Sequence, residues 1–323
     1  MGRKLVLGID FNNMMFGSYY AAPLINEHGM NVNAIKGFFF KLKALKETFN
    51  PDLIVFANDI SRSKTFRRKL YPEYKAQRKV HNDDIINQMR VTSHIISLLG
   101  YQFINNELYE ADDVLGMISR YVSERGYDMI IASSDRDMYQ LVNDNVFILS
   151  PRNNEIIDRE YMYNKYQLTP EQWIDLKILQ GDRSDNIPGI PGIGEKTALY
   201  LMQQYGSIDN IYNNLNNLKA GIATALISGK NLLELTRTLV TIVTDYTKID
   251  LQEDMLKRKD IFCMDIYNTI AELQINSLFN VMNYVLIPEK STNNVLYDTS
   301  ENPIQNKVIE KALVNSVHND TET

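Results

Sequence analysis

The chain has 323 residues, of which 44% are hydrophobic and 23% charged, with a formal net charge of −6 and one cysteine, Cys263. This length allows one large or two modest domains, and a single cysteine excludes a framework of internal disulfides. No apolar run approaches the ~20 residues of a membrane span, and no signal peptide precedes the first predicted strand, so we expect a cytoplasmic protein.

The first half of the chain alternates between strand and helix patterns. Strand patterns lead to Asp10, Asp59 and Asp135, and apolar residues recur at helical spacing in three segments, 34–49, 83–100 and 111–126. Such alternation is typical of the α/β class, with a mainly parallel central sheet flanked by helices. Ligands of these sheets gather at the carboxyl ends of the strands.

Acidic residues occupy those ends and the helix starts that follow them. A lone Asp or Glu at a helix start is usually a cap, but five acidic stations on separate elements are improbable as independent caps. Two unit charges 4 Å apart repel by ~4 kcal/mol at an effective dielectric of about 20, so the crowding calls for bound cations or protonation. The set that predicts a metal site is Asp10, Asp59, Glu110, Asp112, Asp113, Asp135, Asp137, Asp182 and Asp185.

All these candidate ligands are oxygen donors. The four histidines show no ligand spacing with each other or with Cys263, so zinc is disfavoured and Mg²⁺ or Mn²⁺ fits better. A site with this many carboxylates can hold two ions about 4 Å apart, which suits hydrolysis of a phosphodiester.

A basic segment, SRSKTFRRKLYPEYKAQRK, follows Asp59 directly. Since nine of the acids belong to the candidate site, the acidity of the chain is local, and this segment is the candidate for contact with a phosphate backbone. Phe66, Tyr71 and Tyr74 are interleaved with the cations and could stack on unpaired bases. The alternative is a charged surface that is only solvated.

After about residue 158 the strand signal fades and helices follow. Thr169-Pro170-Glu171-Gln172 is a capping box that opens a helix running to about Gly181. The glycine-rich segment DNIPGIPGIGEKTA then fails the Walker A pattern, because Glu195 separates Gly194 from Lys196-Thr197. It predicts instead a tight turn into a helix N-terminus that can hold a phosphate of duplex DNA, with an ordinary helix-turn-helix corner as the alternative.

Three parts are therefore expected along the chain. They are an α/β core at 1–158, with a basic helical gateway at 60–95, a helical part at 159–290, with its duplex-binding element at about 182–206, and a flexible tail at 291–323. Within the tail, IQNKVIEKALVNSV could form a short amphipathic helix that contacts a replication protein or is only transient.

Several motifs in one order carry a family resemblance: LGID, FRRKLYPEYKAQR, YEADDVLG, SSDRDMYQL, LQGDRSDNIPGIPGIGEKTA and QQYGS. Over about residues 3–285 the chain resembles the 5′ nuclease family, which includes bacteriophage flap endonucleases and the 5′-nuclease domain of bacterial DNA polymerase I. The resemblance implies a metal-dependent flap endonuclease and 5′-3′ exonuclease that acts at junctions of duplex and 5′ single strand in DNA replication or repair. With no polymerase domain attached, it implies a stand-alone, monomeric enzyme of the bacteriophage kind.

The resemblance also implies residue roles. A first metal site would use Asp10, Asp59, Glu110, Asp112 and Asp135, and a second would use Asp137, Asp182 and Asp185, with Asp113 supporting. Lys75 and Arg78 would be the basic active-site pair, beside the aromatic Tyr74. The glycine-rich segment would be a helix-hairpin-helix element that binds duplex DNA and a K⁺ ion. The expected DNA contacts are Arg62, Lys64, Arg67, Arg68, Lys69, Lys79, Gly189, Gly192, Gly194, Lys196 and Thr197.

Two other readings stay open at this point. One is a ribonuclease of the related metal-dependent fold, resembling ribonuclease H in removing RNA primers, and the other is a noncatalytic junction-binding protein. The intact acidic set favours an enzyme over the second. A P-loop NTPase is disfavoured by the failed Walker pattern.

Overall fold

The computed structural model describes residues 3–59, 63–78, 81–259 and 265–286. At its centre is a six-stranded sheet with strand order β3-β2-β1-β4-β5-β6. Every neighbouring pair is parallel except β5 with β6. The predicted α/β fold with a mainly parallel sheet is confirmed. The strands are β1 (Leu5–Asp10), β2 (Leu53–Ala57), β3 (Phe103–Ile104), β4 (Asp128–Ala132), β5 (Val146–Leu149) and β6 (Ile156–Ile157).

The central strand β1 is buried along its whole length, as expected for a parallel strand covered on both faces. Val6 packs into one hydrophobic cluster, whereas Leu5, Leu7 and Ile9 pack into another. Because side chains alternate across a strand, these two clusters lie on opposite faces of the sheet. Helices cover both.

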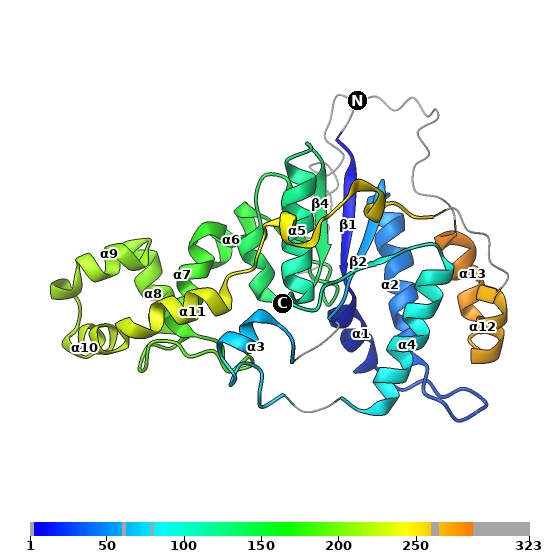
Figure 1. Cartoon of the computed structure of the whole chain (residues 1–323), viewed down its shortest axis with the longest axis horizontal. Coiled ribbons are helices and arrows are strands. Elements are labelled where there is room, and N and C mark those ends of the chain that lie inside the picture. The colour runs from blue at the N-terminus through cyan, green and yellow to red at the C-terminus, as the bar shows by residue number, and fades with distance from the viewer. Residues whose placement is uncertain (1–2, 60–62, 79–80, 260–264, 287–323) are drawn as a thin grey trace, which may run out of the picture.

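The sheet face that carries Leu5, Leu7 and Ile9 is covered by helices from the early and the late parts of the described chain. There α13 packs on α2, although more than 200 residues separate them (Figure 1). These helices are α1 (Phe11–Tyr19), α2 (Asn33–Phe49), α4 (Asp83–Leu98), α12 (Asp265–Leu273) and α13 (Ser277–Val285). The predicted helices at 34–49 and 83–100 are α2 and α4, so both are confirmed.

The opposite face, which carries Val6, is covered by α5 (Ala111–Ser123) and by a run of helices that extends away from the sheet (Figure 1). The helix predicted at 111–126 is α5, so it is confirmed. The capping box at Thr169 is confirmed, with Gln172 as its partner. The helices beyond α5 are α6 (Arg159–Tyr166), α7 (Pro170–Gln180), α8 (Glu195–Tyr205), α9 (Ile208–Asn213), α10 (Ala220–Gly229) and α11 (Leu233–Val240). Short elements complete the described chain: α3 (Phe66–Leu70) and the 3₁₀ helices η1 (Arg136–Leu141), η2 (Leu215–Asn217), η3 (Lys230–Leu232), η4 (Tyr246–Ile249) and η5 (Glu253–Leu256).

The strand order has its switch point between β1 and β4. From β1 the chain order runs toward β3 on one side and toward β6 on the other, so β1 and β4 meet at the switch point of the sheet. In open α/β sheets ligands bind at the carboxyl ends of the strands at such a point. Asp10 ends β1, and Asp135 follows β4 by three residues.

Some predictions fall outside the described residues. These are the contacts assigned to Arg62 and Lys79, and the whole tail 291–323 with its short helix. The limits of the three predicted parts stay a prediction. In the described ranges no helix is long and apolar enough to cross a membrane.

Candidate metal centre and nucleic-acid interface

Asp10, the last residue of β1, lies at this switch point with 5% of its surface exposed. Its carboxylate accepts hydrogen bonds from the backbone N–H of Asn13 at 3.1 Å and from Ser133 Oγ at 2.8 Å. Burial first, and then the nearby carboxylates of Asp59 and Asp135, raise the pKa of Asp10 to about 7. An anion at this position is therefore costly unless a cation stands beside it.

Three further carboxylates lie close enough to interact electrostatically with Asp10. Burial raises the pKa of Asp112, in the first turn of α5, well above its usual value, and Asp135 and Asp10 add to the rise. Asp59 Oδ1 accepts from the backbone N–H of Ala111 at 2.8 Å, which ties it to the same turn. Asp135 caps η1. We call Asp10, Asp59, Asp112 and Asp135 the acidic cluster.

Glu110, at the start of α5, is held by basic and phenolic groups. Tyr74 Oη and Lys75 Nζ each donate to its carboxylate at 2.6 Å, and Arg67 lies 3.4 Å away. Burial raises the pKa of Glu110, but Lys75 and Arg67 outweigh burial, so the net pKa is lowered. Glu110 is thus a stable anion beside the acidic cluster.

The predicted basic pair approaches the loop after α7. Lys75 has a left-handed backbone (φ 53°), and its N–H donates to the carbonyl of Asp185 at 2.8 Å. Lys75 Nζ lies 3.5 Å from the Asp185 carboxylate, and Arg78 forms an ion pair with the same carboxylate. A left-handed conformation in a residue other than glycine is uncommon and occurs often at functional sites. The contacts bring 75–78 against the acids of 182–185.

Lys177 joins the two remaining acids, and sequence reasoning missed it. Its Nζ lies 2.6 Å from both Asp137 and Asp182, and its side chain is 8% exposed. Burial and Asp135 raise the pKa of Asp137 to about 6 despite Lys177. Burial also opposes ionisation of Asp182, but Lys177 and Ser184 lower its pKa to about 2. A lone lysine among the apolar residues of α7 was the available signal.

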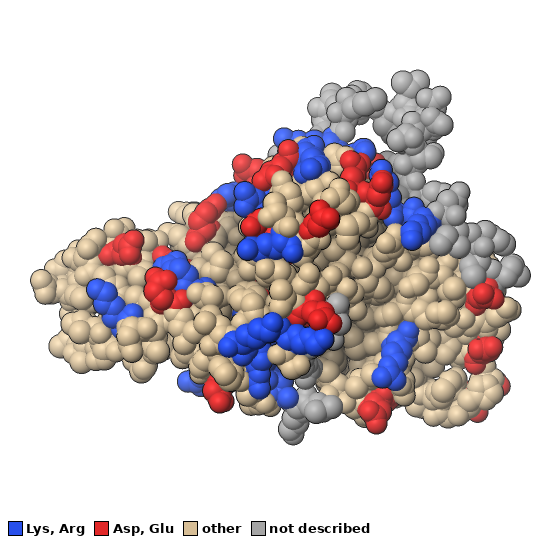
Figure 2. All heavy atoms as spheres, in the orientation of Figure 1, with Lys and Arg blue, Asp and Glu red and all other residues tan. Residues whose placement is uncertain are grey.

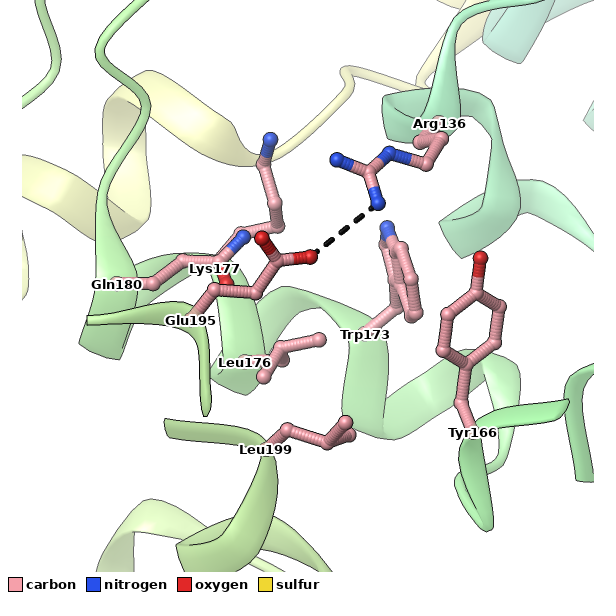
Figure 3. A pocket seen from close by; sticks show the side chains of 8 residues that line it. All are labelled: Arg136, Tyr166, Trp173, Leu176, Lys177, Gln180, Glu195 and Leu199. Atoms are coloured by element: carbon pink, nitrogen blue, oxygen red, sulfur yellow. Dashed lines mark hydrogen bonds and ion pairs between the residues drawn. The ribbon is translucent and has the colours of Figure 1, made fainter. Parts of the chain in front are cut away.

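A small cavity of about 30 Å³ adjoins Lys177 (Figure 3). Above it, Arg136 of η1 pairs with Glu195 of α8 at 3.3 Å, as the dashed line shows. Trp173 Nε1 and Gln180 Oε1 are buried there without a partner among the described residues. The cavity has room for one water, which can satisfy a buried polar atom of its lining.

The donor chemistry of the acidic cluster fits hard divalent cations. All its ligand atoms are carboxylate oxygens, the donors that Mg²⁺ and Mn²⁺ prefer. Asn12 donates to Asp59 at 3.1 Å, while its buried Oδ1 finds no donor in the described chain. Lysine ammonium groups bridge the neighbouring acids Glu110 and Asp185, and Asp137 and Asp182, which shows that these pairs attract positive charge.

As the side chains stand, no group of three or more His, Cys, Asp or Glu residues within the described ranges is arranged to hold a metal ion. Unbridged carboxylates repel one another, and lysine ammonium groups already pair with several of these acids. The assignment of metal ligands therefore stays a prediction.

The predictions that Asp113 binds metal and that Arg67 contacts DNA are wrong, because these two side chains pair with each other in the interior. Asp113 is 0% exposed, and its oxygens accept from Arg67 Nη1 at 2.5 Å and Nη2 at 2.8 Å. Backbone N–H groups of Glu110 and Val243 also donate to Asp113. Arg67 donates further to the carbonyls of Leu239 and Thr241. Asp113 has no oxygen left for an ion, and Arg67 cannot reach a DNA phosphate.

Tyr74 does not serve as a stacking platform, contrary to the prediction. It is 4% exposed, and its hydroxyl is directed at Glu110. A base cannot reach its ring, so Tyr74 instead positions that carboxylate.

Other cations of the basic segment are accessible. Figure 2 shows basic side chains gathered in the lower middle of the view, where Figure 1 places α3, next to acidic ones. Lys64 pairs with Glu107 at 2.9 Å, Arg68 donates to the carbonyl of Tyr74 at 2.6 Å, and Lys69 is exposed. Their predicted DNA contacts stay predictions.

The glycine-rich segment forms the predicted turn into a helix. Gly194 is the N-cap of α8, Lys196 is exposed and Thr197 half-buried in its first turn, and Gly192 has a φ of +88°. Gly189 has a packing role as well, because a Cβ there would lie 2.3 Å from the carbonyl carbon of Gln180. This close approach fixes the loop that carries Asp182 and Asp185.

The metal-free protein is expected to lose stability as the pH rises from about 5 to 7. Asp10 and Asp137 have folded-state pKa values of about 7 and about 6, against an ordinary 3.8, so the folded state binds more protons in this window. Stability then falls with rising pH. Mg²⁺ competes with these protons, so it should raise the melting temperature more at pH 7.5 than at pH 5.5. Thermal unfolding in EDTA and in Mg²⁺ measures both effects; a melting temperature in EDTA that climbs with pH would contradict the prediction.

Two family models together match most of the chain. The family model "5′-3′ exonuclease, N-terminal resolvase-like domain" matches residues 4–167, and "5′-3′ exonuclease, C-terminal SAM fold" matches residues 168–261. The 5′-3′ exonuclease of Aquifex aeolicus is 34% identical over 276 residues, which cover 85% of this chain and 94% of that protein. The thermostable DNA polymerase I of Thermus thermophilus is 34% identical over 277 residues, which cover 85% of this chain and 32% of the polymerase. The chain thus spans about a third of that relative's length.

Among solved structures, the chain is similar to the flap endonuclease of bacteriophage T5, which was solved as a pseudo-enzyme-product complex with DNA and metal ions. The TM-score is 0.60 at 19% identity, and the match covers 89% of this chain and 100% of that protein. At this identity the likeness concerns the fold: an α/β core followed by helices.

Proposed function

Because this chain belongs to the 5′-3′ exonuclease family, we propose that it is a structure-specific 5′ nuclease that hydrolyses phosphodiesters near junctions of single-stranded and duplex DNA, in replication or repair. The observation that carries the proposal is the acidic cluster at the switch point of the sheet, with Lys75 and Arg78 beside it. Carboxylates alone would repel a phosphate, so cations must accompany them.

The residues proposed to hold two divalent ions are those of the acidic cluster with Glu110 for one, and Asp137, Asp182 and Asp185 for the other. When bound, the ions would lower the pKa of the attacking water, which makes it a better nucleophile toward phosphorus, and would supply positive charge for the leaving oxygen. Mg²⁺ or Mn²⁺ suits these ligands.

The chain's own groups would complete the site. Lys75 and Arg78, which pair with acids in the resting protein, would turn toward phosphoryl oxygens and stabilise the charge that develops there. Tyr74 would keep Glu110 oriented through its hydroxyl, which donates at 2.6 Å. Lys177 would neutralise Asp137 and Asp182 until a cation replaces it, since its ammonium lies 2.6 Å from each carboxylate.

The duplex part of the substrate is proposed to contact the turn before α8. Gly192 and Gly194 are exposed there, and open space surrounds Gly194, so backbone N–H groups can approach a phosphate. Lys196 adds a point charge. A K⁺ ion at this element, a monomeric state, and the division into parts at 1–158 and 159–290 belong to the same proposal.

A cleavage assay on a 5′-flap DNA with Mg²⁺ tests the proposed function. We expect cleavage near the junction, complete inhibition by EDTA, and weaker action on a matched flap whose 5′ strand is RNA. Faster cleavage of the RNA flap would favour the primer-removing ribonuclease instead. Junction binding without any cleavage in Mg²⁺ or Mn²⁺ would refute a nuclease and leave a binding protein. A flap with a blocked 5′ end then asks whether the strand must be threaded.

A further inference from the structure

A second pocket, of about 440 Å³, lies next to the acidic cluster, on the side of the molecule that α1 covers. Its walls come from three parts of the chain: α1 with Gly17, the end of β4 with Ser134, and the turn between β5 and β6 with Arg152. Lys41 of α2 also lines it, and a Cβ on Gly17 would lie 3.6 Å from Lys41 Nζ. The ammonium thus lies close to the backbone of α1 at Gly17.

Two cations, Lys41 and Arg152, line this pocket, and neither has a counter-ion among the described residues. Burial lowers the pKa of Lys41, and the positive charge of Arg152 lowers it further. Throughout the described ranges, neither side chain forms an ion pair or a hydrogen bond. Most other cations near the site pair with acids, as Lys75 and Lys177 do. Two like charges on one pocket repel each other, so the group that fits between them is an anion.

The pocket shares a wall with the acidic cluster. Asn13, which lines it, donates its N–H to Asp10 at 3.1 Å and accepts from the N–H of Ser134 at 3.0 Å. The preceding residue, Ser133, donates its hydroxyl to the Asp10 carboxylate and accepts a hydrogen bond from the N–H of Asp135. An anion in the pocket would therefore sit next to whatever binds at the acidic cluster.

We propose that this pocket binds a phosphate of the substrate strand, adjacent to the phosphate that is cleaved; the inference rests on the proposed function. Phosphates follow one another every ~3.4 Å of axis along each strand, so a strand at the acidic cluster carries its neighbour into reach. Lys75 and Arg78 contact elements on the α5 and α7 side, whereas Lys41 belongs to the opposite face of the sheet. A strand crossing the sheet edge would be held by cations on both sides of the acids.

The salt dependence of binding tests the proposal. The double variant Lys41→Met with Arg152→Met should bind a 5′-flap DNA in Ca²⁺ about tenfold more weakly at ~0.1 M salt, and the slope of log K against log salt should fall by roughly 1 to 2, because each lost contact removes about 0.7 to 0.9. Lys43→Met is the matched control on the same helix, since Lys43 pairs with Glu47 and does not line the pocket. Arg152→Met alone, in an exposed turn, gives half of the effect if the double variant folds poorly.

Replacing single phosphates by uncharged methylphosphonates locates the contact. At one position next to the scissile phosphate, we expect the methylphosphonate to lower the affinity of the wild type. The same replacement should leave the affinity of the double variant unchanged, because that variant has already lost the contact. A double variant with the wild-type salt slope would overturn the proposal. So would a variant that loses binding of inorganic phosphate, measured by calorimetry, while its salt slope is unchanged, since that assigns a free anion. Binding in Ca²⁺ is measured without cleavage, and wild-type cleavage in Mg²⁺ separately tests the proposed function.

Discussion

Asp135→Asn is expected to lower the turnover of flap cleavage by about 10³-fold or more, while binding of the same DNA in Ca²⁺ changes by less than about threefold. Asp135 is the residue whose charge raises the pKa of Asp10, Asp112 and Asp137, so it touches both proposed ion sites. An asparagine keeps the oxygen that accepts from the N–H of Asp137 at 2.9 Å, so the cap of η1 survives. Only the charge is removed.

Stability provides a second measurement on the same variant. Without metal, Asp135→Asn should melt no lower than the wild type, because one repelling charge has left the acidic cluster. With Mg²⁺ the wild type should gain more stability than the variant. Asp144→Asn is the matched control, since its side chain is 87% exposed and pairs with Arg159 on the surface. Wild-type turnover in Asp135→Asn would rule out the mechanism proposed above.

Lys75→Ala is expected to lower turnover by about 10²- to 10³-fold, the usual cost of one removed charge-stabilising group. Lys75 is the cation that lies between Glu110 and Asp185, at 2.6 Å and 3.5 Å. Its loss removes the stabilisation of phosphoryl oxygens and also raises the pKa of Glu110, which Lys75 now lowers. Single-turnover rates at saturating enzyme measure the chemical step separately from binding.

The pH profile separates the two effects of that substitution. If Lys75 acted only through Glu110, the variant would recover its rate at high pH, where the carboxyl ionises again. We expect instead a loss that persists across the profile. Lys248→Ala, an exposed cation outside the basic segment that pairs with Asp245, serves as the control and should keep turnover within about twofold. An unchanged rate in Lys75→Ala would remove this lysine from the active site.

The buried interior pairs show where sequence reasoning failed. Arg67 and Tyr74 were assigned to DNA because they stand among cations and aromatics, yet both are buried. The partners that draw Arg67 inward are Asp113, 46 residues away, and the carbonyl of Leu239, 172 residues away. A local pattern carries no information on such partners. Lys177 had a local signal, its place among apolar residues of α7, but its contact with Asp137 of η1 again joins remote segments.

Features that neighbouring residues specify could be predicted from the amino-acid sequence alone. Apolar spacing set the helices α2, α4 and α5, Thr169 and Gln172 set the start of α7, and β1 is uniformly apolar up to Asp10 because it is covered on both faces. The class of the sheet and the family followed from the order of these segments.

Which charged side chains come together depends on the three-dimensional fold. The strand order puts β1 beside β4, which brings Asp10 and Asp135 together, and folding brings Lys41 and Arg152 to one pocket from α2 and a distant turn. Helix and strand patterns arise from interactions a few residues apart, whereas ion pairs and pockets depend on contacts between remote segments. The energy of a charge depends on those neighbours and on its burial, and the fold sets both.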